Sequence, residues 1–176
     1  MNSRPFEAAG VRDLLALIRE DLSANAGYPK SQFVLALFRL GQFARRDARR
    51  TRSLHTRLFG AAYEIITQWV LGIELPLATE VGRRLRIFHG VGLVVNASSK
   101  IGDDVVLRHG VTIGNDGATD RCPTLRDGVD VGAGAVIIGG LVIGSYARVG
   151  ANSVVTKNVE PGMTVAGAPA RPVTSH

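Results

Sequence analysis

The fold is predicted from two stretches of the chain, residues 81–113, VGRRLRIFHGVGLVVNASSKIGDDVVLRHGVTI, and residues 125–155, LRDGVDVGAGAVIIGGLVIGSYARVGANSVV. In both stretches an aliphatic residue returns every six positions, often with glycine directly behind it. Neither an α-helix, with about 3.6 residues per turn, nor an ordinary strand, with a period of about two, produces this spacing. A coil of three short flat strands does, because each hexapeptide turns one corner and sends one aliphatic side chain inward.

The repeating aliphatic residues form runs in phase: Val81, Ile87 and Leu93; Ile101, Leu107 and Ile113; and Leu125, Val131, Ile137, Ile143, Val149 and Val155. Glycine follows several of them, at positions 82, 102, 114, 132, 144 and 150. Stacked coils bury a column of aliphatic side chains that no single coil could bury alone. We therefore expect a mainly β protein, a parallel β-helix of hexapeptide repeats.

Composition narrows the class of protein. The chain has 176 residues, a net charge of +6 and a single cysteine, Cys122, so an internal disulfide is excluded, which fits a reducing, cytoplasmic environment. No apolar run reaches the roughly 18 residues of a membrane span, and the first residues do not resemble a signal peptide. The positive charge favours an anionic partner. Few aromatic residues and a single cluster of basic residues argue against nucleic acid.

Three regions are expected along the chain. Residues 1–75 have helical hydropathy, residues 76–160 carry the β-helix, and residues 161–176 form a tail that caps its open end. Residues 115–124 are polar and not strand-like, although the repeat continues in phase beyond them. We expect them to form a loop extruded from one coil, where binding residues often lie.

The helical region is predicted to contain three helices. The first spans residues 10–23, and its apolar side is formed by Val11, Leu14, Leu15, Ile18 and Leu22. Gly27 and Pro29 end it, and Ser31 is the predicted N-cap of the second helix. The third runs from about residue 53 to 71 and is apolar around much of its circumference, through Leu58, Tyr63, Ile65, Ile66, Trp69 and Val70. It is therefore expected to pack on other helices or on another subunit.

A basic run occupies residues 45–52, RRDARRTR. One interpretation is a solvated surface between helices. The other is electrostatic contact with an anionic lipid surface or a polyphosphate, which is worth about 1 kcal/mol per charge near a membrane. The sequence leaves peripheral membrane contact open.

The candidate chemistry centres on His89 and His109. Each follows an aliphatic residue of the repeat by two positions, so each is expected to point outward at a similar corner of adjacent coils. His55, in the helical region, and the terminal His176 are expected to be inert. Glu74 lies fifteen residues before His89, and a carboxylate behind an imidazole orients a general base for a hydroxyl. The alternatives are a solvated histidine pair and an exposed carboxylate.

Several motifs together resemble a known family. They are GIELP at 72–76, GRRLRIFHGVG at 82–92, HGVTIG at 109–114, DRCP at 120–123, GAGAVIIG at 132–139 and AGAPAR at 166–171. This combination resembles the serine acetyltransferase family of hexapeptide-repeat acyltransferases over residues 72–172. EDLSAN at 20–25 and the short helical region are more similar to the colanic-acid-type exopolysaccharide acetyltransferases, a branch of the same group.

The resemblance implies a left-handed parallel β-helix and a homotrimer, or a dimer of trimers, with active sites between subunits. It implies acetyl-CoA bound along the coils and no metal ion. By motif position, His89 matches the general base and Glu74 its acidic partner. The remaining matches are the thioester-facing backbone at Gly114 and Asn115, and the CoA-groove positions Ala133, Arg148, Ala151, Gly167 and Ala168.

The acceptor side departs from the family pattern. Phe88 stands where serine acetyltransferases have aspartate, Cys122 replaces the histidine of an Arg-His-Pro motif after Arg121, and the Asp-Pro helical segment is not found. We therefore expect acetyl transfer to a sugar hydroxyl in exopolysaccharide assembly, with Phe88, Arg121 and His109 on the acceptor side. Arg121 is alternatively a solvated loop charge, and His109 is the alternative base. Cys122 is interpreted as a loop residue because direct transfer needs no acyl-enzyme. L-serine O-acetylation and a non-catalytic trimeric scaffold are the alternative functions.

Overall fold

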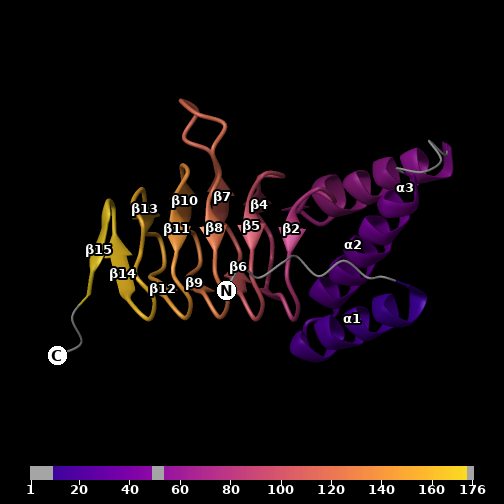
Figure 1. Cartoon of the computed structure of the whole chain (residues 1–176), viewed down its shortest axis with the longest axis horizontal. Helices are drawn as coiled ribbons and strands as arrows, with labels where there is room; N and C mark the ends of the chain where they lie inside the picture. Colours follow the sequence, from indigo (N-terminus) through magenta and orange to yellow (C-terminus); the bar gives the residue numbers. More distant parts are fainter. Residues whose placement is uncertain (1–9, 49–53, 174–176) are drawn as a thin grey trace.

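The strands stack into a three-sided parallel β-helix in the computed structural model, which describes residues 10–48 and 54–173 (Figure 1). Sheet A is β1 (Ile73–Glu74), β4 (Leu93–Val95), β7 (Thr112–Gly114), β10 (Val136–Ile138) and β13 (Val154–Val155). Sheet B is β2 (Glu80–Val81), β5 (Lys100–Ile101), β8 (Thr124–Leu125) and β11 (Val142–Ile143). Sheet C is β3 (Arg86–Phe88), β6 (Val106–Arg108), β9 (Asp130–Val131), β12 (Arg148–Val149), β14 (Thr164–Gly167) and β15 (Ala170–Pro172).

The six-residue repeat forms the core of this helix, as the sequence predicts. All the phased aliphatic residues from Val81 to Val155 are at most 4% exposed. Equivalent residues pair across coils, as Ile87 does with Leu107, so each column continues from coil to coil. The predicted mainly β fold, a parallel β-helix preceded by helices, is confirmed. Among the strand pairs of the described residues, only the last hairpin, β14 with β15, is antiparallel.

Several of the glycines lie where one coil touches the backbone of the next. A Cβ atom on Gly82 would lie 2.6 Å from the carbonyl carbon of Gly102, and one on Gly132 would lie 2.4 Å from the amide nitrogen of Ala151. Neither backbone can move without breaking the ladder. Gly114 differs, because the nearest atom to its Cβ would be Asn96 Cβ at 3.7 Å.

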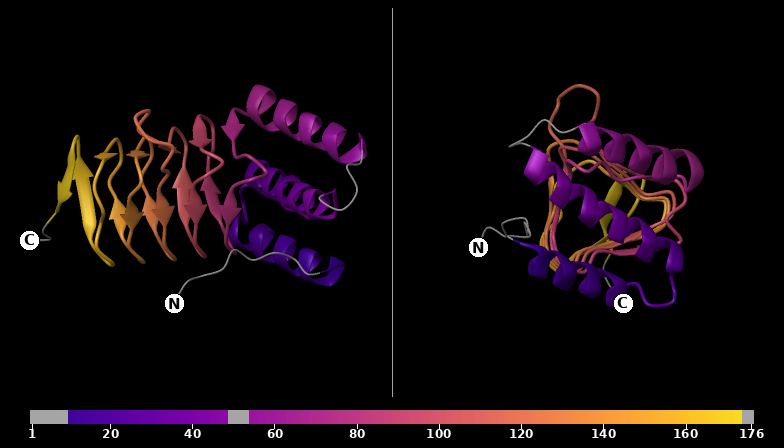
Figure 2. Two further views of the ribbon diagram at one scale, coloured as in Figure 1. Left: turned by 45° about the horizontal axis from the view of Figure 1, so that its top comes forward. Right: turned by 90° about the vertical axis from the view of Figure 1, so that its right-hand side faces the viewer.

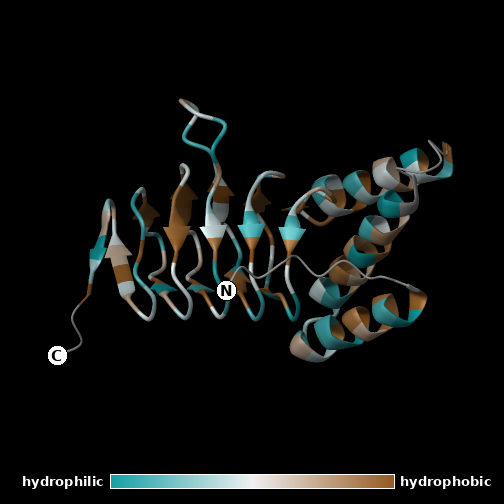
Figure 3. Ribbon diagram, in the orientation of Figure 1, coloured by the Kyte–Doolittle hydropathy of each residue, from teal (hydrophilic) through white to brown (hydrophobic). Residues whose placement is uncertain are grey.

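The helices cover the N-terminal end of the β-helix, which would otherwise expose an open edge and the core (Figure 2). They are α1 (Val11–Ala24), α2 (Pro29–Ala48) and α3 (Leu54–Glu64), and α3 continues as the π-helix η1 (Ile65–Val70). Hydrophobic and hydrophilic residues alternate around them (Figure 3). Residues 49–53, which include the second half of the basic run, and His176 lie outside the described residues.

Two details of the predicted helices are wrong. The helix α2 begins at Pro29, so Ser31 lies inside its first turn, and the Ser31 hydroxyl donates to the carbonyl of Ile87 at 2.6 Å instead of capping the helix. In α1 the buried residues are Leu14, Leu17 and Asp21, whereas Val11 and Leu15 of the predicted apolar side are exposed. The buried side therefore includes a carboxylate, which a hydropathy pattern assigns to solvent.

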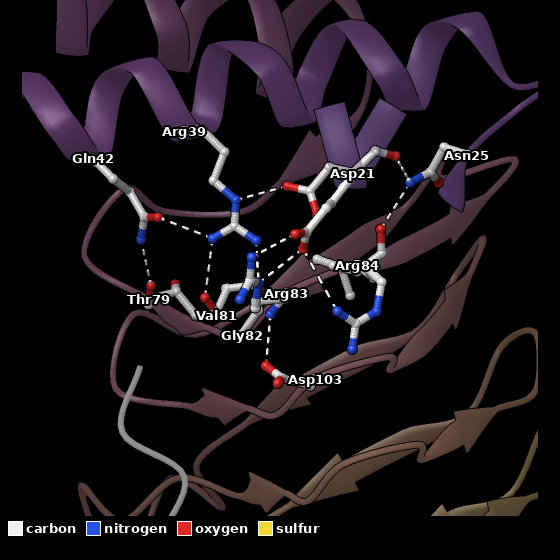
Figure 4. A network of polar contacts seen from close by, with 12 residues as sticks. Asp21, Asn25, Arg39, Gln42, Thr79, Val81, Gly82, Arg83, Arg84 and Asp103 are labelled. Atoms are coloured by element: carbon white, nitrogen blue, oxygen red, sulfur yellow. Dashed lines mark hydrogen bonds and ion pairs between the residues drawn. The ribbon is translucent and has the colours of Figure 1, made fainter. Parts of the chain in front are cut away.

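That carboxylate belongs to a buried ion pair that joins α1 and α2 to the first coil (Figure 4). Arg39 Nε donates to Asp21 Oδ2 at 2.7 Å, and its terminal nitrogens donate to the carbonyls of Val81, at 3.0 Å, and Gly82. Both side chains are at most 1% exposed. Burial raises the pKa of Asp21, and the Arg39 guanidinium acts in the opposite sense. The helical region is thus held to the β-helix by charge as well as by packing.

We expect Gly132→Ala to lower the free energy of unfolding by about 1–3 kcal/mol, because the added methyl group meets rigid backbone. Gly114→Ala, which also follows a buried aliphatic residue of the repeat, should change it by less than about 0.5 kcal/mol. Denaturant unfolding followed by circular dichroism measures both. Equal destabilisation by the two variants would contradict the contact explanation.

We expect Arg39→Met to lower the free energy of unfolding by about 3–5 kcal/mol, because Asp21 is left buried without a counter-charge. The loss should grow as the pH rises above the usual aspartate range, because a carboxyl whose pKa is raised by folding stabilises the folded state at low pH and loses that contribution as the pH rises. Arg84→Met is the matched control. It breaks partly exposed pairs with Asp104 and Glu20 and should cost less than about 1 kcal/mol. Similar losses for both variants would rule out a special role for the buried pair.

Candidate active site

The two candidate histidines lie at one corner of the β-helix, where each coil passes from sheet C to sheet A. We call this the C–A corner; it comprises residues 89–92, 109–111, 132–135 and 150–153. His89 follows β3 and His109 follows β6, and both are exposed. Their ring centroids are 6.2 Å apart with an interplanar angle of 72°. The spacing along the sequence therefore places the two imidazoles side by side, as expected.

His89 is presented to solvent by its backbone conformation, with φ of 65°. Non-glycine residues rarely adopt positive φ. Arg84, Asp104 and Tyr146 adopt it as well, with φ between 54° and 60°. The conformation is thus shared by coil corners and is not a strain specific to catalysis.

The C–A corner continues from the histidines along a line of very small residues. The amide of Gly134 donates to the carbonyl of His109 at 3.0 Å, and the amide of Asn152 donates to that of Ala133 at 2.8 Å. Ala133 and Ala151 therefore lie on the coils that follow His109. A Cβ on Gly110 would be in ordinary contact with the Gly134 Cα, at 3.5 Å, whereas a Cβ on Gly134 would lie 2.2 Å from Asn152 Oδ1, so the Asn152 side chain covers Gly134. An extended ligand could approach the backbone along this line.

The other predicted CoA-groove residues lie away from the corner. Arg148 is exposed on sheet C, within β12, and pairs in register with Asp130 of β9. Gly167 and Ala168 belong to the β14–β15 hairpin at the C-terminal end of the stack, where the Gly167 amide donates to Ser153 Oγ at 3.1 Å. They therefore lie at the C-terminal end of the row of small residues that follows His89 and His109 along the C–A corner.

Glu74 lies on sheet A, paired in register with Val94, and its side chain is exposed. Within residues 10–48 and 54–173, no hydrogen bond or ion pair joins Glu74 to His89. The orientation of His89 by Glu74 therefore stays a prediction.

The predicted thioester residues, Gly114 and Asn115, and Arg121 lie at the C-terminal ends of the sheet A strands, away from the C–A corner where these strands begin. Gly114 ends β7, and residues 115–123 leave the coil there as a protruding loop (Figure 1); Thr124, which the sequence assigns to this loop, is already in β8. The stem of Arg121 lies against Gly140 of the next coil, because a Cβ on Gly140 would be 2.6 Å from Arg121 Cβ. The strand β7 has three residues and is therefore about 10 Å long, so its C-terminal end lies about that far from the corner that carries His109.

A cleft of about 580 Å³ lies beside the loop, between Asp116 and the coils that follow it. Residues 138–141 and 156–158 complete its lining, including Lys157. Asp116 Oδ1 accepts hydrogen bonds from the amides of Ala118, at 3.1 Å, and Thr119, at 2.9 Å. These bonds, that of Thr119 first, lower the pKa of Asp116. The loop is thus closed on itself by an ionised carboxylate.

One aromatic residue at the site is missed by sequence reasoning. The Tyr28 ring, from the α1–α2 turn, lies 4.8 Å from the Phe88 ring and 5.6 Å from the His89 ring, centroid to centroid. Arg108 lies over Phe88 at 5.7 Å. Gly27 and Pro29 mark a turn around Tyr28, but a local turn signal does not identify the distant strand it contacts.

Among the residues that the structure describes, no three His, Cys, Asp or Glu side chains gather to hold a metal ion. In the same ranges, no helix is long and apolar enough to cross a bilayer.

The chain is similar to known acetyltransferases. No family model matches it. It is 40% identical to a serine acetyltransferase of Helicobacter pylori over 131 residues, 72% of this chain and 77% of the relative. It is 37% identical to the colanic acid biosynthesis acetyltransferase WcaB of Escherichia coli over 157 residues, 86% of this chain and 96% of the relative. Among solved structures, a serine acetyltransferase in complex with CoA matches with a TM-score of 0.77 and 28% identity, over 93% of this chain and 71% of that one.

We expect the amides of Ala118 and Thr119 to report the titration of Asp116. Because folding lowers the pKa of Asp116, its hydrogen bonds persist as the pH falls through the usual aspartate range and break only at lower pH. NMR measurement of the two amide shifts against pH tests this expectation. Asp116→Ala should abolish the titration, whereas a transition at the usual aspartate pKa would contradict the loop geometry.

Proposed function

Because the chain belongs to the serine acetyltransferase family of hexapeptide-repeat acyltransferases, we propose that it transfers an acetyl group from acetyl-CoA to a hydroxyl of a saccharide. Family membership makes the protein an acyltransferase, which argues against a non-catalytic scaffold. It also supports an acyl-CoA as the donor. The observation that carries the proposal is the exposed imidazole pair at one end of the C–A corner, followed by a line of glycine and alanine.

The C–A corner suits an extended thioester ligand. Gly110, Ala133 and Ala151 carry no side chain beyond Cβ, so a pantetheine-like chain could lie against the backbone at these positions. Its thioester would reach the histidines, while Gly167 and Ala168 of the terminal hairpin would lie near its far end. Of the positions that the family resemblance assigns to CoA, Ala133, Ala151, Gly167 and Ala168 lie along this line.

In the proposed mechanism, His89 accepts the proton of the acceptor hydroxyl as that oxygen attacks the thioester carbonyl. The bond from carbon to sulfur then breaks, and protonated His89 returns the proton to the departing thiolate. Backbone N–H groups at Gly114 and Asn115 would stabilise the oxyanion of the tetrahedral intermediate, which is worth about 3 kcal/mol or more in comparable sites. Glu74 would orient His89 and stabilise the imidazolium.

This mechanism requires more than one copy of the chain. Gly114 and Arg121 lie beyond the C-terminal end of β7, whereas His89 lies at the corner where the sheet A strands begin. A single protomer therefore does not bring the proposed base and the proposed thioester and acceptor residues together. We propose a homotrimer in which His89 of one protomer faces Gly114, Asn115 and Arg121 of its neighbour. The exposed apolar residues of α3 and η1 support self-association: Leu54, Leu58, Ile65, Trp69 and Val70 are 57–85% exposed in the single chain.

The saccharide acceptor is favoured over L-serine by Phe88. An apolar ring, and not a carboxylate, precedes the base on β3 and offers no counter-charge to a substrate ammonium group. The relative named for colanic acid biosynthesis, which is matched over nearly its whole length, supports the same choice. L-serine is the second candidate, because other relatives are named for it. Membrane contact through the basic run stays a prediction.

We expect His89→Ala to lower kcat/KM by roughly 10²–10⁴-fold, since it removes the proton acceptor. His109→Ala should leave more activity, and His55→Ala, which removes an exposed histidine on α3, should leave activity unchanged. Release of the CoA thiol is the readout, with methyl glycosides or L-serine as acceptors.

Two results would decide against the proposal. Full activity of His89→Ala would transfer the role of base to His109 or exclude imidazole catalysis. A higher kcat/KM for L-serine than for every methyl glycoside would establish the second candidate.

A further inference from the structure

The α1–α2 turn is clamped to the strand that carries the candidate base. Asn25 Nδ2 donates to the carbonyl of Leu85 at 2.8 Å, and the amide of Ile87 donates to Asn25 Oδ1 at 2.9 Å. From the other side of the turn, the Ser31 hydroxyl donates to the carbonyl of Ile87 at 2.6 Å. Asn25 is fully buried and Ser31 is 2% exposed. Polar bonds shielded from water are costly to break, so the turn is held firmly against β3.

Tyr28 lies between the two halves of this clamp. Its amide donates to the carbonyl of Asn25 and its carbonyl accepts from the amide of Gln32, both at 3.0 Å, so its backbone is held on both sides. Its ring is half-buried and lies edge-on to His89, with an interplanar angle of 82°. Within the described part of the chain, its phenol oxygen makes no hydrogen bond. The turn thus presents an aromatic wall beside the base.

The rings of this wall contact one cation and no carboxylate among the described residues: Arg108 lies over Phe88, and the other ring contacts are Tyr28 with Phe88 and with His89. Arg108 is already paired with Asp130 and donates to the carbonyl of Val131 at 2.9 Å. A free amino acid needs opposite charges for its ammonium and carboxylate groups, because leaving either desolvated and unpaired is costly. A sugar ring instead presents a C–H face that packs on an aromatic face, with hydroxyl groups at its edge.

We infer that Tyr28, whose ring packs against Phe88 at a tilt of 42°, forms the acceptor wall of the His89 site and selects a saccharide ring over a free amino acid; this inference rests on the proposed function. The ring of the acceptor packs on Tyr28, and one of its edge hydroxyls faces His89. Tyr28 acts by binding the acceptor and takes no part in proton transfer.

The experiment uses the full chain with Tyr28→Leu, which keeps apolar bulk but removes the ring, and Tyr28→Phe, which keeps the ring. Tyr146→Leu is the matched control, because Tyr146 is 71% exposed at a different corner, over Gly128. The probes are methyl β-D-glucopyranoside, methyl β-D-galactopyranoside and L-serine. Saturation-transfer NMR in the presence of CoA measures acceptor binding, and thiol release from acetyl-CoA measures turnover.

Tyr28→Leu should raise the acceptor KM for a methyl glycoside by about tenfold and remove its saturation-transfer signal. The KM for acetyl-CoA and the CoA signal should stay within about twofold of wild type, which shows that the variant is folded. Tyr28→Phe and Tyr146→Leu should behave like wild type.

Three outcomes would overturn the inference: no glycoside binding to the wild-type chain, unchanged glycoside binding to Tyr28→Leu, or an equal fall in kcat for glycosides and L-serine with KM unchanged. The last would mean that Tyr28 only positions His89. Glycoside binding that depends on Tyr28, without transfer of acetyl to any acceptor, would instead refute the proposed function and leave the binding wall intact.

Discussion

Direct stacking of each coil on the next is the constraint on which the structure depends. Parallel strands of adjacent coils are hydrogen-bonded at a spacing of about 4.8 Å, and at corners such as Gly132 the backbones meet so closely that a Cβ atom has no room. Any residue that follows the repeat is therefore placed by its position in the coil. His89 and His109 are neighbours for this reason alone, since Phe88 and Arg108 pair in register just before them.

Much of the fold could be predicted from the sequence because the repeat encodes burial and register together. An inward aliphatic such as Ile137 has the same environment as Ile113 one coil earlier. The helices lack this redundancy. Their positions follow from hydropathy, but the buried side of α1 is set by the Asp21–Arg39 pair, and one contact between distant charged residues leaves no periodic signal. Leu17 is buried on the same side of α1 as Asp21, four residues before it, whereas Leu15 is exposed.

The candidate site likewise contains residues that the repeat places and residues that it does not place. Counting along the repeat places His89, His109, Ala133 and Ala151 at one corner. It could not find Tyr28, which arrives from a turn that is clamped to β3 by Asn25 and Ser31, because side-chain bonds to backbone carbonyls carry no spacing rule. The partnership of Glu74 with His89 rests on motif position, and the two residues lie on different sheets of the same coil with no bond between them in the described structure.

This division has a consequence for acceptor choice. The base and the line of small residues belong to the β-helix, whose geometry is set by coil stacking and tolerates little change. The aromatic wall belongs to the helical region and touches the β-helix through a few polar bonds and the Tyr28–Phe88 contact. A change of turn sequence between Asn25 and Ser31 could therefore alter what lies beside His89 without disturbing the coils. In the proposed arrangement, the β-helix supplies the base for acetyl transfer, and the α1–α2 turn contributes to the choice of acceptor.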